Sequence, residues 1–181
     1  EVQLGRLPMD QLEDQDLLSV YTRSALYGAV KALRASAIEL VGRTQLHDQI
    51  DLSGVYGTLA DLQSATPEKL QWFSKAQQVA VDQGRSPAIW LLRALPIHLS
   101  AGDSTTATDI INRIQQDHIN EPGIADQFYG LLMQLGILRP DGTPAAAPSQ
   151  PSASSSGGKL WTPGDPNPPP PDEPDEQKPD K

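Results

Sequence analysis

The three histidines are the first places to look for chemistry, because an imidazole can act as a base or bind a metal. They are His47, His98 and His118, and no two of them have the i, i+4 spacing of a helical metal site. Asp51 follows His47 by four residues, a spacing that could give a weak metal pair. Surface charge at a helix end is the favoured interpretation. His98 stands between leucines, which is typical of a packed or hydrogen-bonded histidine rather than of a catalytic base.

Carboxylates are the second candidates, and they gather at residues 13–16 and 172–176. Catalytic carboxylates need a shaped and partly dry pocket, whereas these clusters stand at an expected helix start and in a Pro-rich tail. The chain has no cysteine, no Gly-rich phosphate loop and no recognisable base beside Ser24 or Ser36. We therefore expect no catalytic residue, no metal and no cofactor, and hence not an enzyme.

Charge narrows the classes of partner. The net charge is -9, and residues 1–138 carry 16 Asp and Glu against 10 Lys and Arg. Such a surface repels polyanions, so nucleic acid and anionic membrane surfaces are poor partners. No apolar run is long enough to span a membrane, so we expect no membrane insertion. The compartment is left open, with the cytoplasm slightly favoured, because no signal peptide is visible and the N-terminus, which begins at Glu1, is expected to be incomplete.

The residues before Leu138 are expected to be helical throughout, because their apolar side chains recur at spacings of three and four. The longest segment, residues 14–43, contains Gly28, which should bend or split it, and Asp14 or Asp16 could cap its start. Further helical segments are expected at residues 51–65, 66–84, 86–102, 103–119 and 121–138.

Local signals set the expected ends of these helices. Thr66 and Ser86 each precede a proline and should act as the N-caps of two helices. Gly84 should end the first of these helices and Gly102 the second. Pro96 should kink or interrupt its helix. Twelve of the 17 prolines lie from residue 140 onward, so residues 1–138 form the expected helical domain and residues 139–181 a disordered acidic tail.

Two stretches align with one another, residues 56–76 and residues 94–114. In the second, the Gly102-Asp103 turn is followed by the small residue Ala107; in the first, Gly57 is the small residue of the first helix. Phe73 and Ala76 occupy the aromatic and small positions of the second helix there. This pattern resembles the tetratricopeptide repeat, a helix–turn–helix unit of about 34 residues.

The resemblance covers roughly residues 50–138 and departs from the family in several places. His98 or Ile97 stands where the family favours Tyr, Pro96 is foreign to that helix, and the closing proline is displaced to Pro122. Ala76 and Ile114 are 38 residues apart. The resemblance implies an all-α fold in which antiparallel helix pairs stack as a short α-solenoid.

The same resemblance implies where a partner would bind, since the concave face of a helical solenoid is built from the first helix of each pair. Trp90 and Arg93 are candidate partner-binding residues on that basis, together with Asp61 and Gln63, although core packing is the favoured interpretation of Trp90.

A second candidate lies in the tail, where the segment KLWTPG places Leu160 and Trp161 among residues that otherwise bury nothing. These two residues are either apolar anchors of a docking motif or a chance tryptophan in a solvated tail.

The sequence therefore predicts a non-catalytic interaction or scaffold module that binds a protein or peptide, at the C-terminal end of a larger protein. The alternative is a structural accessory region of an enzyme whose catalytic domain lies upstream.

Overall fold

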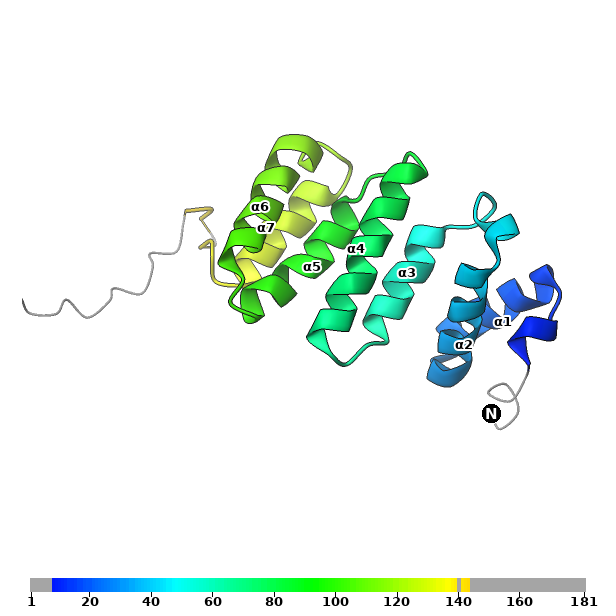
Figure 1. Ribbon diagram of the computed structural model, residues 1–181. Coiled ribbons are helices and arrows are strands. Elements are labelled where there is room, and N and C mark those ends of the chain that lie inside the picture. Colours follow the sequence, from blue (N-terminus) through cyan, green and yellow to red (C-terminus); the bar gives the residue numbers. More distant parts are fainter. Residues whose placement is uncertain (1–7, 140, 144–181) are drawn as a thin grey trace, which may run out of the picture. The chain divides into compact units, whose positions relative to one another are not determined.

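The computed structural model describes residues 8–139 and 141–143, and the statements below concern those residues. Nearly all of the predicted tail, with Leu160 and Trp161, lies outside them. The regular elements of the described part are all helical (Figure 1), which confirms the all-α prediction. In chain order they are η2 Met9–Gln11, α1 Asp14–Tyr27, α2 Val30–Gly42, η3 Thr44–Leu46, α3 Leu52–Asp61, α4 Thr66–Asp82, α5 Ala88–Ser100, α6 Ser104–Arg113, η4 Ile114–His118 and α7 Ile124–Gln134.

The longest predicted helical segment, residues 14–43, is split at Gly28, which was one of the two expected outcomes. Gly28 has φ +65°, a left-handed conformation that glycine adopts without a steric penalty. The N–H of Ala29 donates to the carbonyl of Ser24, which closes the end of α1, and α2 begins at Val30. Splitting the segment lets the chain reverse, so that α1 and α2 pack against each other.

The helices pack mostly with their neighbours in sequence, and alternate helices also meet. Tyr21 Oη of α1 and Thr58 Oγ1 of α3 share a hydrogen bond of 2.9 Å, Trp90 of α5 reaches Gly57 of α3, and α5 packs against α7. Helix α4 contacts both α3 and α5, and α6 contacts α5. The helices α1, α3, α5 and α7 begin at residues 14, 52, 88 and 124, so the helix pair recurs every 36 or 38 residues.

Two groups of buried side chains form the core. One lies among α3 to α7 and includes Phe73, Leu95 and Phe128; the other lies among η2, α1, α2 and α3. Tyr56 and Trp72 border both groups, and their rings stack with centroids 5.7 Å apart. The small and aromatic positions predicted from the repeat are buried with them: Gly57, Phe73, Ala76 and Ala107.

Arg43 fixes the N-terminal helices to one another. Its guanidinium lies 2.6 Å from Asp14 Oδ1 and 3.0 Å from Glu39 Oε1, and it also donates to the carbonyl of Met9 at 3.0 Å. These hydrogen bonds, first to Asp14 and then to Glu39, raise the pKa of Arg43 above its usual value. A single side chain therefore joins η2, α1 and α2.

Several local expectations need correction. Glu13, rather than Asp14 or Asp16, is the N-cap of α1, and the two aspartates lie in its first turn. Ala65, rather than Thr66, is the N-cap of α4, because Thr66 already lies inside the helix. Pro87, rather than Ser86, is the N-cap of α5, although Ser86 Oγ accepts the N–H of Ala88 at 3.1 Å.

Pro96 does not interrupt α5, which continues to Ser100. Most residues of α5 before Pro96 are buried, and Ile97 and Leu99 after it pack against the same core, so tertiary packing holds the helix in spite of one missing N–H donor. Helix α6 ends in the π-helical turn η4, which the sequence did not indicate. None of the helices in the described residues is long and apolar enough to cross a membrane.

Candidate functional site: a groove across α4, α5 and α6

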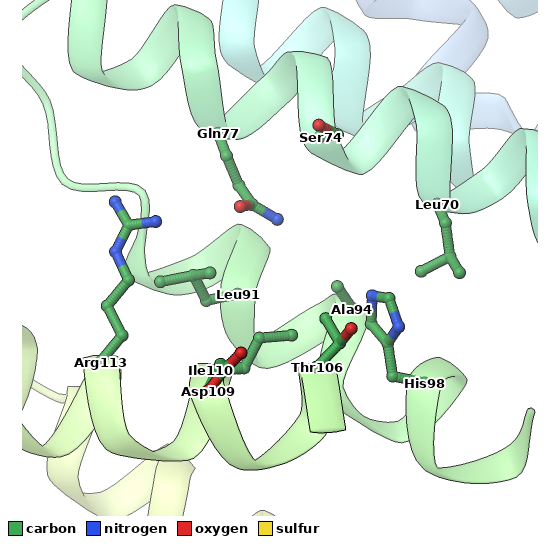
Figure 2. Close-up of a pocket in the computed structure, with 10 residues that line it drawn as sticks. All are labelled: Leu70, Ser74, Gln77, Leu91, Ala94, His98, Thr106, Asp109, Ile110 and Arg113. Carbon is green, nitrogen blue, oxygen red and sulfur yellow. The ribbon is translucent and has the colours of Figure 1, made fainter. Parts of the chain in front are cut away.

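A groove of about 440 Å³ lies between α4 and α6, with α5 as its floor (Figure 2). Each helix contributes residues from one face, at spacings of three, four or seven, which is the period of an exposed helical stripe. The lining residues are Leu70, Ser74 and Gln77 of α4, Leu91, Ala94 and His98 of α5, and Thr106, Asp109, Ile110 and Arg113 of α6.

The two ends of the groove differ in chemistry. At one end Figure 2 shows the Gln77 amide and the Arg113 guanidinium reaching into the opening above Leu91. At the other end are Leu70 and His98. Each helix spans seven residues along the groove, which corresponds to a length of about 10 Å. The groove therefore has an apolar floor with polar groups at its ends and rims.

His98 is oriented by a carboxylate at its end of the groove. Its Nδ1 lies 3.0 Å from Asp103 Oδ2, and Asp103 also caps α6 by accepting the N–H of Thr106 at 3.1 Å. Hydrogen bonds from the side chain and the backbone of Thr106, and then from His98, lower the pKa of the Asp103 carboxyl. The other ring nitrogen of His98 makes no hydrogen bond within residues 8–139 and 141–143, so it is available to a ligand.

The α6 wall carries two exposed charges, Asp109 and Arg113. They are four residues apart, yet neither takes part in an ion pair among the residues that the structure describes. Their charges remain open to a bound molecule. The groove can thus hold an apolar group on its floor and hydrogen-bond polar groups of the same molecule at its two ends.

The predicted partner-binding residues of α5 lie at its contact with α3, away from the residues that line the groove. Trp90 is only 8 % exposed, and its ring lies against Gly57. Arg93 is exposed, pairs with Asp61 Oδ2 at 2.6 Å, and lies over the rings of Phe73 and Trp90. The structure therefore brings Trp90 and Arg93 together as part of the packing, and their role in partner binding stays a prediction.

The remaining histidines are engaged by backbone or carboxylate groups. His47 Nε2 lies 3.0 Å from the carbonyl of Val41, and His118 Nδ1 lies 2.7 Å from Glu121 Oε1. No group of three or more His, Cys, Asp or Glu within the described ranges is arranged to hold a metal ion. Asp51, the predicted companion of His47, instead caps α3 through the N–H of Gly54 and pairs with Arg85 at 2.7 Å.

Sequence reasoning missed the groove, although part of its signal was present. Ser74, Gln77, Asp109 and Arg113 stand at helical spacing on the polar sides of their segments, which alone indicates only solvent exposure. Only the packing of α4 and α6 on either side of α5 makes them the rim of one site.

Known proteins give no further guide to this site: no protein-family model, no curated protein and no solved structure matches the chain.

Proposed function

We propose that this chain is a non-catalytic helical module that binds a short peptide segment of a partner protein in the groove across α4, α5 and α6. The groove itself carries the proposal: Leu91 and Ala94 of α5 form its floor, Ile110 of α6 lies beside them, and hydrogen-bonding groups stand at both ends. A site of about 10 Å holds about three residues of an extended chain. One apolar side chain would cover the floor while its backbone bonds to the rim.

The arrangement of the helices supports this proposal. A helix pair that recurs every 36 or 38 residues, with alternate helices in contact, is consistent with a short tetratricopeptide-like solenoid. The period is longer than the usual 34 residues or so of that family. In this proposal the peptide lies between the second helices of two pairs, and not on the face built by first helices that the sequence predicted.

Selection from a random peptide display library tests the proposal on the full chain. We expect enrichment of short segments that share one apolar position, and loss of their binding in Ser74→Trp, which fills the groove from its exposed rim. Gln71→Trp is the matched control, because Gln71 is exposed on the same helix but does not line the groove. Selected peptides that bind Ser74→Trp as well as the wild type would contradict the proposal, as would a selection that enriches no peptide.

The alternative role, a structural accessory region of an enzyme, stays a prediction. The absence of catalytic activity is likewise a prediction, and turnover assays on the full chain with His98→Ala as the comparison would test it.

A further inference from the structure

The turn between α1 and α2 presents an exposed apolar surface. Leu26 and Tyr27 are each 76 % exposed and Val30 is 55 % exposed. They lie together because Gly28 ends α1 and reverses the chain within three residues. Folding gains nothing from apolar side chains left in water, and contiguous exposed apolar residues mark interaction sites.

Basic side chains surround this apolar surface. Arg23 precedes Leu26 and Tyr27 by three and four residues on α1, and Lys31 and Arg34 follow Val30 on α2. All three are exposed, and none forms an ion pair within the part of the chain that the structure describes, although the Arg34 guanidinium donates a hydrogen bond to the carbonyl of Leu62 at the end of α3. We call these six residues the basic corner: Arg23, Leu26, Tyr27, Val30, Lys31 and Arg34.

The acidic side chains of α1 and α2 do not neutralise Arg23 and Lys31 of the basic corner. No Asp or Glu occurs between Asp16 and Glu39, and both stand toward the far ends of their helices. Asp16 is 11 residues before Tyr27 and Glu39 is nine after Val30, which places them about 16 Å and 13 Å away along the helices. Both separations exceed the Debye length of about 8 Å at physiological ionic strength. Glu39 is also engaged by Arg43.

We infer that the basic corner is a docking surface for an acidic segment of a partner protein in which carboxylates flank apolar side chains. The apolar residues of that segment would cover Leu26, Tyr27 and Val30, while its carboxylates pair with Arg23 and Lys31. A peptide segment is favoured over an anionic membrane because a membrane plane extends past the corner and meets the acidic remainder of a chain with net charge -9. The corner is separate from the groove, so this inference does not rest on the proposed function.

A labelled synthetic peptide of alternating glutamate and leucine is the probe, and fluorescence anisotropy on the full chain is the measurement. We expect binding that weakens as salt is added, and a loss of about tenfold or more in Arg23→Glu/Lys31→Glu, because two attractive contacts become repulsive. Leu26→Ser/Tyr27→Ser should weaken binding at every salt concentration. Lys75→Glu/Arg139→Glu is the matched control, because it makes the same change of charge, with two cations replaced by two anions, at exposed sites on α4 and after α7.

A second measurement does not depend on the variants. Amide chemical shifts of Leu26 to Lys31 in the wild type should move when the peptide is added, while those of the groove residues should not. The inference is overturned if the peptide does not bind, or if it binds the corner variants as tightly as it binds Lys75→Glu/Arg139→Glu. It is also overturned if the corner mediates only sedimentation with anionic vesicles, or only self-association of the chain.

Discussion

The two sides of helix α5 differ in how completely they are packed. Toward α3, the space left by Gly57 is filled by Trp90, and Arg93 covers the ring while pairing with Asp61; we call these four residues the closed seam. Toward α4 and α6, the floor includes the small side chain of Ala94, and no side chain fills the groove above it. Helix α5 is thus closely packed on one side and lines an open groove on the other, so substitutions on its two sides can test stability and the proposed peptide binding separately.

The largest effect is expected from Trp90→Ala, which empties the closed seam. Replacing a buried tryptophan by alanine costs about 3–5 kcal/mol of the free energy of unfolding, because the cavity collapses only in part. Urea denaturation followed by circular dichroism would measure it. Trp72 offers a comparison, since it is only half-buried beside Tyr56. A cost for Trp90→Ala no larger than that for Trp72→Ala would show that the seam is not the tighter contact.

Gly57→Ala tests the same contact from the other helix. A Cβ at position 57 would lie 2.2 Å from a ring carbon of Trp90, so the ring or the helices must move. Such overpacking costs about 1–3 kcal/mol. The matched control is Gly130→Ala in α7, where a Cβ meets no atom within 4 Å; there alanine should be neutral or stabilising, because it favours the helix. Equal stabilities of the two variants would disprove the close approach.

The closed seam also shows what could and could not be predicted. The helices could be predicted from the sequence, because apolar spacing and glycines are local signals. Gly28, Gly84 and Gly102 lie just past the ends of α1, α4 and α5. The small residue at Gly57 was found through the repeat, but its contact with Trp90 joins residues 33 apart, which no local pattern encodes. The groove forms only where α4, α5 and α6 pack together, so the sequence pattern of its rim residues indicated only solvent exposure.

The ion pair of the closed seam should contribute less than the aromatic contact. Arg93 and Asp61 are both well exposed to solvent, and exposed pairs typically contribute about 0.2–1 kcal/mol. A double-mutant cycle of Arg93→Gln and Asp61→Asn should give a coupling energy in that range. A coupling of several kcal/mol would mean that the pair, rather than Trp90, closes the seam. The same Arg93→Gln protein also tests the predicted partner-binding role of Arg93. That role requires the free energy of peptide binding to fall by more than the free energy of unfolding does.

The smallest expected effect lies at the open side, where Asp103 caps α6 and holds His98 at the end of the groove. Its pKa is lowered in the folded chain, first by the hydrogen bonds from Thr106 and then by His98. A carboxyl whose pKa is depressed on folding adds stability above its unfolded pKa of about 3.9, and this stability is lost as the pH falls through the lower folded value.

Asp103→Asn keeps an N-cap acceptor, because asparagine caps about as well as aspartate. The difference in melting temperature between wild type and Asp103→Asn should therefore be constant above about pH 5 and shrink below about pH 4. Asp109→Asn, an exposed acid on the same helix without an ion pair in the described residues, should show no such convergence. Parallel behaviour of the two variants across this range would mean that the Asp103 carboxylate gains no stability from its hydrogen bonds with Thr106 and His98, contrary to the contacts in the structure.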